Sequence, residues 1–469
     1  MNIHMAVVTA SLLIGHCFCK NIEDDDHVQS LPELAEPVKF KHYSGYLKAG
    51  GTRKLHYWFV ESQGTPETDP VVVWLNGGPG CSSLEGMFAE LGPFRIDKRR
   101  PTLHLNPYSW NKVANILFLE SPAGVGFSYD PSKPIDYNYK TNDEETADDN
   151  YLSLLDFFRK FPQFLQNELF VTGESYSAVY VPLLVQRILE GDSTSGAINL
   201  KGYAIGNGYL DALKVRRSKM YFGYYHGLWS SSLWKDMTQH CCDGDASKET
   251  CEFFNSHSLR CWRNLFYAWI NMKDLNPYNI YAPCVRDVSD SKIPFIHNVW
   301  NLHTENFTRF SKVFKAEDHL TPACTDDRTL TEYLNRADVK AALHVEESPL
   351  KWTLCSDKVH ANYGKQYSSM SKVVKKLVDS GRLRTLIYNG DFDSVCSYLS
   401  SQWFVDELGY QPTSNLKAWW VNNQVAGYFR THEGNLTFLT VKGAGHMVPE
   451  DKPEEALKMI TNFLKNDPF

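Results

Sequence analysis

The sequence of 469 residues contains no apolar run of the length that a membrane-spanning helix needs, about 20 consecutive apolar residues. The apolar stretch at residues 6–15 is too short to cross a bilayer, but its length and position are typical of the apolar part of a secretory signal. We therefore expect a signal peptide at residues 1–19, cleaved after Cys19, and a mature chain without a membrane span.

The charge of the chain is nearly balanced, which removes one large class of partners. There are 48 Lys and Arg residues against 55 Asp and Glu, a formal net charge of -7 at pH 7. Nucleic-acid binding depends on clustered positive charge. The short basic cluster at residues 372–376 instead fits the polar face of a helix. The composition predicts no nucleic-acid partner.

Metal and cofactor motifs are missing as well. The sequence has no H-E-x-x-H, and G-V-G at residues 124–126 lacks the third glycine of a dinucleotide-binding loop. The D-x-D pairs at residues 243–245 and 391–393 lack the central glycine and the final glutamate of a calcium loop. The cysteines at positions 241, 242, 251 and 261 lack the C-x-x-C spacing of zinc ribbons. We predict no metal ion and no cofactor.

The number of cysteines agrees with secretion. Of eleven cysteines, Cys17 and Cys19 lie in the expected signal, so 11 - 2 = 9 remain. Four disulfides and one free thiol would fit an oxidising compartment. In a secretory chain the two N-x-S/T sequons, at Asn306 and Asn435, become candidate glycosylation sites.

Short apolar runs alternate with helical patterns along much of the chain. Residues 71–75, 115–120, 168–173, 202–206, 384–388 and 437–442 are typical of buried parallel strands. Residues 143–161 and 453–464 each place apolar side chains on one helical face. This alternation predicts a layered α/β fold. Residues 211–327 are aromatic, rich in cysteine and loop-like, and we expect an inserted cap subdomain there, stapled by disulfides.

The sequence G-E-S-Y at residues 173–176 carries the strongest chemical indication. It follows a predicted strand and precedes a predicted helix at residues 180–189, as in a nucleophile elbow. Serine needs a base within hydrogen-bond reach, and His446, in G-A-G-H-M-V-P at residues 443–449, is the candidate. Either Asp391 or Asp393 would orient that histidine, because both follow the predicted strand at 384–388 and spacing does not separate them.

The order serine, acid, histidine is that of α/β-hydrolase enzymes. We therefore predict an α/β-hydrolase fold, with a central mixed, mostly parallel sheet and the disulfide-rich cap inserted after the serine strand and helix. Acyl transfer also needs donors for the developing oxyanion. The amide of Tyr176 is one donor in this geometry. The N-G-G loop at residues 76–78 would supply a second, although the same residues are common in ordinary turns.

Together these motifs resemble the serine carboxypeptidases (peptidase family S10), most closely those of the lysosomal cathepsin A, or protective protein, type. The resemblance runs from about residue 38 to the C-terminus and bounds the two parts of the core at 38–210 and 328–469. Its motifs include W-L-N-G-G-P-G-C-S-S at 74–83, N-P-Y-S-W-N at 106–111, E-S-P-A-G-V-G-F-S-Y at 120–129 and I-G-N-G at 205–208. It implies an exopeptidase that removes C-terminal residues from peptides and proteins at acidic pH.

The resemblance also assigns roles to single residues. It implies a triad of Ser175, His446 and Asp393, in preference to Asp391, with the amides of Gly78 and Tyr176 as oxyanion donors. It implies that the substrate's terminal carboxylate is held by Asn76, the Gly77 amide, Glu90 and Glu174. The implied disulfides are Cys81–Cys355, Cys241–Cys261, Cys242–Cys251 and Cys284–Cys324, with Cys396 as a free thiol near the site.

Two glutamates in a carboxylate-binding site give a reason for an acid optimum. Carboxylates repel a carboxylate unless they share protons, and paired acids raise one another's pKa. The site should therefore bind a peptide C-terminus best when it is protonated.

The chain departs from the family pattern, usually G-E-S-Y-A-G, at Ser177 and Ala178. Both residues add atoms to the first helical turn, which would cost up to a few kcal/mol if the surroundings cannot yield. Glu85 lies near the implied pocket for the leaving residue. It would favour basic or polar C-terminal residues if it points there, and the alternative is that it faces solvent.

Several alternatives stay open at this point. Residues 285–323 correspond to the region where cathepsin A-type proenzymes are cut, so we expect either an activation cleavage or an uncut surface loop there. The resemblance implies a homodimer and a second role as a stabilising partner of lysosomal glycosidases, with or without catalysis. A third function on the same fold is acyl transfer to an alcohol. The expected destination is the lysosome or the extracellular space.

Overall fold

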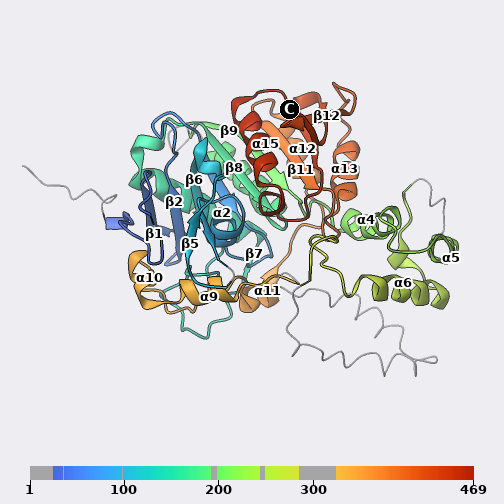
Figure 1. Ribbon diagram of the computed structural model, residues 1–469, viewed down its shortest axis with the longest axis horizontal. Helices are drawn as coiled ribbons and strands as arrows, with labels where there is room; N and C mark the ends of the chain where they lie inside the picture. The colour runs from blue at the N-terminus through green and yellow to red at the C-terminus, as the bar shows by residue number, and fades with distance from the viewer. Residues whose placement is uncertain (1–24, 35, 98, 192–197, 243–248, 285–323) are drawn as a thin grey trace, which may run out of the picture.

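A computed structural model describes residues 25–34, 36–97, 99–191, 198–242, 249–284 and 324–469 (Figure 1). The expected signal peptide, the expected cleavage segment 285–323 and the sequon at Asn306 lie outside the described residues. Asn435 is described, and its exposed side chain directly precedes a strand.

A ten-stranded sheet forms the centre of the described chain, in the order β1-β2-β6-β3-β8-β9-β11-β14-β13-β12. Its six middle strands are parallel. They are β6 (Asn115–Leu119), β3 (Val71–Leu75), β8 (Leu169–Glu174), β9 (Leu200–Gly206), β11 (Arg384–Gly390) and β14 (Leu436–Val441). The predicted mostly parallel sheet is confirmed.

Antiparallel strands extend both edges of this sheet, as the predicted mixed sheet requires, but the sequence analysis did not say which residues form them. One edge consists of β1 (His42–Lys48) and β2 (Lys54–Val60), and the other of β13 (Gln424–His432) and β12 (Lys417–Val421). Two short pairs lie outside it: β4 (Phe94–Ile96) with β5 (Leu103–Leu105), and β7 (Thr141–Asn142) with β10 (Tyr363–Gly364).

Helices cover both faces of the sheet. Successive residues of a strand point to opposite sides, so a wholly apolar strand has apolar side chains to bury on each face. Val71 and Val73 of β3 belong to one core cluster, which α2 (Asp143–Lys160), α3 (Ser177–Gly191), α12 (Ser371–Asp379) and α13 (Tyr398–Glu407) complete. Val72 and Trp74 belong to the opposite cluster, with α9 (Arg328–Leu334), α10 (Ala337–Ala342), α14 (Val448–Asp451) and α15 (Pro453–Lys465). A further short helix, α11 (Asp357–Asn362), follows Cys355.

The beginning of α2 shows how local sequence sets a helix boundary. The Asn142 side chain accepts a hydrogen bond from the Glu145 amide, and residues 143–145 place three acids in the first turn. A side-chain cap and negative charge at the N-terminus both stabilise a helix start.

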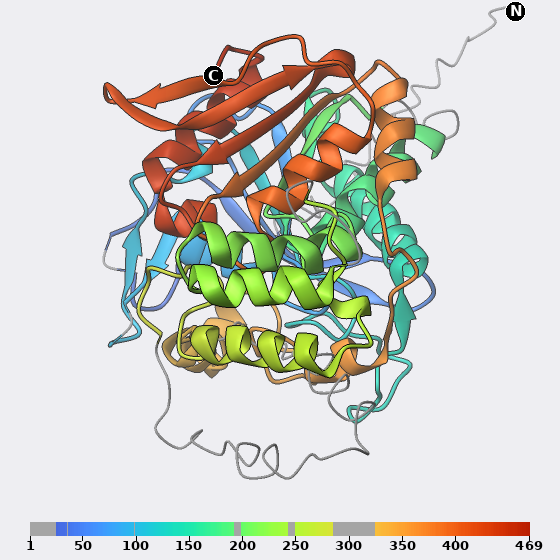
Figure 2. The same cartoon turned by 90° about the vertical axis from the view of Figure 1, so that its right-hand side faces the viewer.

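The inserted region is helical, so our expectation of a loop-like texture was wrong. It contains α4 (Ala212–Tyr225), α5 (Ser231–Cys241) and α6 (Leu259–Met272), which lie together beside the sheet (Figure 2). Aromatic and cysteine side chains from these helices form a third small core cluster, which also includes Leu399 of α13. Many of the aromatic side chains of the insertion belong to this small core.

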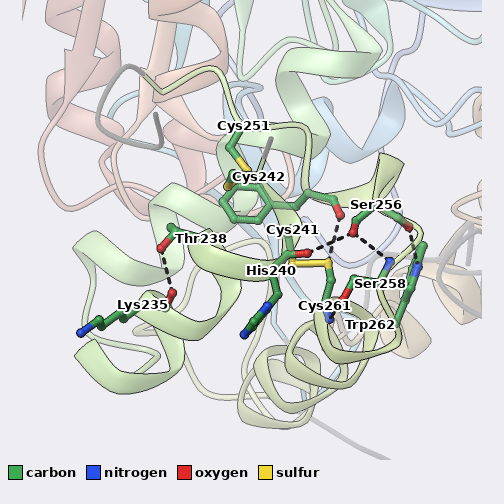
Figure 3. Close-up of a disulfide and its surroundings, with 11 residues drawn as sticks. Lys235, Thr238, His240, Cys241, Cys242, Cys251, Ser256, Ser258, Cys261 and Trp262 are labelled. Atoms are coloured by element: carbon green, nitrogen blue, oxygen red, sulfur yellow. Dashed lines mark hydrogen bonds between the residues drawn. A yellow bond between two sulfur atoms is a disulfide. The ribbon is translucent and has the colours of Figure 1, made fainter. Parts of the chain in front are cut away.

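Two disulfides hold this region together, as Figure 3 shows. Cys241–Cys261 joins the end of α5 to the first turn of α6, and Cys242–Cys251 closes the intervening segment. Ser256 reinforces the connection, because its hydroxyl donates to the His240 carbonyl and its own carbonyl accepts from Trp262 Nε1. Disulfides are typical of small subdomains whose own core is limited.

Two further disulfides involve the core and the flank of the insertion. Cys81–Cys355 connects the loop after β3 to a segment 274 residues later, and Cys284–Cys324 joins the ends that flank residues 285–323. Cys396 is a free, buried thiol. Four disulfides suit an oxidising compartment such as the secretory pathway. None of the helices in the described ranges has both the length and the apolar character needed to span a membrane.

Candidate active site

Ser175 stands at a sharp turn between β8 and α3. Its φ of 61° lies in the left-handed region, its amide donates to the Gly206 carbonyl at 3.0 Å, and its carbonyl accepts from the Tyr209 amide at 2.9 Å. Between residues 169 and 185, Ser175 is partly exposed and all the remaining residues are buried. The strained turn thus lifts one hydroxyl out of an otherwise buried strand and helix.

His446 and Asp393 form a buried pair. His446 Nδ1 lies 2.7 Å from Asp393 Oδ2. Asp393 also accepts hydrogen bonds from Asn207 Nδ2 at 2.9 Å and from the amides of Val395 and Cys396 at 2.7 and 3.2 Å. A carboxylate surrounded by donors is an acceptor toward the ring, so the histidine proton belongs on Nδ1. Nε2 of His446 is buried and has no hydrogen-bond partner among the described residues.

Asp391, the alternative that spacing left open, points elsewhere. Its Oδ1 accepts the Gly443 amide at 2.7 Å, which fixes the start of the histidine loop. Burial raises the pKa of Asp391. The two aspartates therefore have different partners. Asp393 is bonded to the His446 ring, and Asp391 is bonded to the backbone amide at the start of the His446 loop.

The glycine loop after β3 packs directly against the serine turn. A Cβ on Gly77 would lie 2.4 Å from the Tyr176 amide nitrogen and 2.8 Å from the Ser175 Cβ, so only glycine fits there. Gly78 has φ of 112°, which also favours glycine. Within the described part of the chain, no hydrogen bond engages the amides of Gly78 and Tyr176. Two free amides beside a serine are suited to hold an oxyanion.

A second polar cluster lies beside this loop and consists of Asn76, Glu90 and Glu174. Asn76 Nδ2 lies 2.9 Å from Glu90 Oε1 and 3.2 Å from Glu174 Oε1. Its Oδ1 is held by Trp74 Nε1 at 2.7 Å and by the Gly86 amide at 3.2 Å. The amide of Asn76 is therefore oriented with its nitrogen toward the two carboxyl groups.

Both glutamates are buried, and burial raises the pKa of each. For Glu174 the negative charges of Glu90 and Glu85 raise the pKa further, and so does a hydrogen bond to Glu90. Burial raises the pKa of Glu90 by more than hydrogen bonds with Asn76 and Glu174 lower it, so the pKa stays above its ordinary value. Two buried carboxyl groups that both contact one amide nitrogen hold protons to a higher pH than free glutamate does.

Glu85 joins this acidic group. Its side chain is only 6% exposed, so the solvent-facing alternative was wrong. Burial raises the pKa of Glu85, followed by the charges of Glu90, Glu450 and Asp327.

Ser177 and Ala178 fit their surroundings without visible conflict. The Ser177 hydroxyl donates to the Leu75 carbonyl at 2.8 Å, and the side chain lies against Gly173, where a Cβ would approach it to 2.7 Å. Ala178 lies in the same way against Gly208. Each added group therefore has a partner or a facing glycine, which offsets the packing cost that the sequence alone suggested.

One residue of the site was missing from our sequence analysis. Asn207 donates to Asp393 and accepts the Gly390 amide through Oδ1 at 3.1 Å, so it links the ends of β9 and β11. The available signal was its place directly after a predicted strand, since the carboxyl ends of parallel strands meet at one edge of the sheet.

This arrangement defines a class of protein. A serine on an elbow, a histidine bonded to an aspartate and two free amides beside the serine are the components that α/β-hydrolases use for acyl transfer.

Comparison with known proteins defines the class further. A family model for serine carboxypeptidases matches residues 32–466. The lysosomal protective protein of Mus musculus is 41% identical over 464 residues, which cover 95% of this chain and 95% of the mouse protein. A serine carboxypeptidase of Caenorhabditis elegans is 38% identical over 469 residues, covering 97% and 96% of the two chains.

Among solved structures, a prohormone-processing carboxypeptidase from Saccharomyces cerevisiae matches with a TM-score of 0.71 at 22% identity, over 95% of this chain and 96% of that one. This likeness supports the α/β-hydrolase fold. The chain belongs to the serine carboxypeptidase family, and it is a serine-type carboxypeptidase, an exopeptidase. The expected family and the expected exopeptidase class are confirmed.

Proposed function

We propose that this carboxypeptidase cleaves the last peptide bond of its substrates through an acyl-enzyme on Ser175. In this mechanism His446 Nε2 removes the serine proton during attack and later returns it to the leaving amine. Asp393 holds the ring in the tautomer with the proton on Nδ1 and stabilises the imidazolium. The observation that carries the proposal is the 2.7 Å contact of His446 with Asp393, beside the strained turn that exposes Ser175.

The tetrahedral intermediate would place its oxyanion between the amides of Gly78 and Tyr176. Support comes from the close approach of Gly77, the residue before Gly78, to the Tyr176 amide and the Ser175 side chain. Donors fixed before the reaction stabilise charge as it develops and need no reorganisation.

The same loop gives a reason for exopeptidase specificity. We infer that Asn76, the Gly77 amide, Glu90 and Glu174 hold the free carboxylate of the substrate. Asn76 already directs its amide nitrogen toward the two carboxyl groups, so a substrate carboxylate there would receive donors from Asn76 and from the proton that the glutamates share.

This proposal predicts an acid optimum. The raised pKa of Glu90 and of Glu174 keeps the pair protonated to a higher pH than free glutamate. Below that raised pKa the pair donates to the substrate carboxylate, and above it two negative charges repel that carboxylate. Binding should therefore weaken as the pH rises through the raised pKa.

Glu85 is proposed to line the pocket for the leaving residue. It is buried in the same acidic group as Glu90 and Glu174, so an ionised Glu85 would attract a basic side chain and a protonated one would accept a polar side chain.

The cellular setting is also a proposal. The mouse relative is named as a lysosomal protective protein, and the disulfides suit the secretory pathway, so we propose a lysosomal or secreted enzyme with a signal peptide and glycans at Asn306 and Asn435. By the same similarity we propose a homodimer, activation by cleavage within 285–323, and a stabilising role toward lysosomal glycosidases. The carboxylate-binding cluster favours peptide C-termini over the acyltransferase alternative.

The test is release of C-terminal amino acids from blocked dipeptides between about pH 4.5 and 7.5, before and after limited proteolysis. Ser175→Ala, His446→Ala and Asp393→Asn are measured beside the wild type. We expect acid-favoured release that falls by about 10⁴-fold in the aspartate variant and is lost in the other two. Full activity of Ser175→Ala or His446→Ala would refute the triad.

A further inference from the structure

The segment of residues 276–281, which follows α6 and precedes Cys284, lies across the loops that carry the acid and the base. We call this segment the strap. On the acid side, the Pro277 carbonyl accepts from both the amide and the hydroxyl of Ser394, at 3.0 and 2.7 Å. The Ile280 amide donates to the Phe392 carbonyl at 3.2 Å. The strap is therefore bonded to the residues on both sides of Asp393.

On the base side, the strap is bonded to His446 itself. The His446 amide donates to the Tyr278 carbonyl at 2.7 Å, and the two rings meet edge to face with centroids 4.9 Å apart. The preceding residue, Gly445, is so close that a Cβ there would lie 2.2 Å from the Tyr278 carbonyl oxygen. The histidine loop and the strap are thus in direct backbone contact.

One carboxylate fastens this contact. Asp451 of α14 accepts the Gly445 amide at 2.7 Å and Asn279 Nδ2 at 3.0 Å, both through Oδ2. Asn279 Oδ1 in turn accepts the Tyr281 amide at 3.1 Å, which fixes the orientation of the Asn279 side chain. Asp451 and Asn279 together close a ring of hydrogen bonds between the strap, α14 and the histidine loop.

The histidine loop needs such a restraint because its own backbone is soft. It contains Gly443 and Gly445 within four residues, and Gly443 has φ of 78°. Glycine loses more conformational freedom on folding than any other residue. A base on such a loop keeps its direction only if neighbouring segments hold it.

We propose that Asn279 and Asp451 are positioning residues that hold the His446 loop against the strap, so that the inserted subdomain sets the geometry of the catalytic base. The inference rests on the proposed role of His446. Neither side chain touches the reacting atoms, and each acts through the backbone of residues 445 and 446. Their loss should slow the chemical step and leave substrate binding nearly unchanged.

The test compares Asn279→Ala, Asp451→Ala and the conservative Asp451→Asn with the wild type. Gln186→Ala is a matched control, because it removes an amide-to-carboxylate bond of 2.8 Å, to Glu190, on the exposed side of α3. For each variant kcat and KM are measured with a blocked dipeptide, together with the rate at which a small organophosphorus fluoridate modifies Ser175 and the unfolding temperature.

We expect kcat and the modification rate to fall by about 10- to 100-fold in both alanine variants, because a misplacement of about 1 Å can have that effect. KM should change by less than about threefold. Asp451→Asn, which keeps an acceptor for the Gly445 amide, should fall between those variants and the wild type. Gln186→Ala should match the wild type.

Wild-type kcat in Asn279→Ala and in Asp451→Asn would overturn the inference, and so would an increase in KM at constant kcat. A loss that follows only the unfolding temperature would overturn it as well. His446→Ala distinguishes a failure of the proposed function from a failure of the positioning role. If that variant is active, the proposed function fails. If it is inactive while the Asn279 and Asp451 variants are normal, only the positioning role fails.

Discussion

Replacing Glu174 with Gln should remove most of the pH dependence of substrate binding while leaving the catalytic groups in place. Glutamine has the shape of glutamate, keeps an oxygen that can accept from Asn76 Nδ2, and offers an N–H to the substrate carboxylate at any pH. The variant therefore replaces a donor that depends on protonation with a permanent one.

The size of the effect follows from the requirement for one proton. Burial and then the charge of Glu90 raise the pKa of Glu174, so the wild type binds the carboxylate well below that raised value and poorly above it. If one shared proton is needed, kcat/KM falls about tenfold for each pH unit above the raised pKa, which corresponds to about 1.4 kcal/mol per unit. In Glu174→Gln the part of the decline in kcat/KM that the carboxylate site causes should be less than about threefold over two pH units.

The assay measures kcat/KM for a blocked dipeptide and for the corresponding dipeptide amide between about pH 4.5 and 7.5. The amide has no terminal carboxylate, so its rate should lack the steep decline even in the wild type. Glu190→Gln is the control variant, because Glu190 lies on the exposed side of α3 and only bonds to Gln186, Lys376 and Arg187 are described for it.

Two results would refute the reasoning. If kcat/KM of Glu174→Gln falls with pH as steeply as that of the wild type, the Glu174 carboxyl group does not control binding. An equal slope for the amide and the free acid in the wild type would place the pH dependence in the reaction machinery, away from the carboxylate site.

Three further predictions test other parts of the site. Burial raises the folded-state pKa of Glu85, so its contribution to stability is complete below about pH 4.3 and is lost as the pH rises through the raised pKa. Urea unfolding should therefore find Glu85→Gln more stable than the wild type at about pH 7.5 and no more stable at about pH 4, and equal stability at both would contradict this. Ser177→Ala removes a buried 2.8 Å hydrogen bond and should lose about 1 kcal/mol of unfolding free energy with nearly normal kcat, whereas a large loss of activity would mean that this hydroxyl shapes the serine turn. Gly77→Ala would bring a Cβ to 2.4 Å from the Tyr176 amide, so kcat should fall by about 100-fold or more in a folded protein, and normal kcat would exclude the proposed oxyanion site.

Much of the site could be predicted because its signals are local. The serine turn needs only a strand, a glycine, a serine and a helix start within a few residues, and the sequence around Ser175 supplies all of them. The buried parallel strands were equally clear, since strands covered on both faces are continuous apolar runs. Two of the antiparallel edge strands, β1 and β13, mix polar residues with apolar ones, so they lack the continuous apolar run that identified the parallel strands.

The inserted subdomain shows where local signals fail. Its aromatic and cysteine residues predict loops by composition, but in the folded chain they form a common core that three helices share. The helical period was present in part of this region, since the buried residues Cys261, Leu265 and Ala268 recur on one face of α6. The aromatic and cysteine-rich composition was therefore given too much weight.

Local sequence was enough to identify the serine, the histidine and their order along the chain, because each lies in a short motif that can be recognised from its own residues. Spacing along the chain did not separate Asp391 from Asp393, and the family resemblance implied Asp393. The fold gives the physical reason, since each aspartate meets a different distant segment. Only the tertiary structure revealed the role of Asn207, the burial of Glu85 and the strap that contacts His446, because their partners are separated from them by many residues in the chain. Contacts of that kind arise when the carboxyl ends of parallel strands converge at one edge of the sheet, and no single stretch of sequence contains that information.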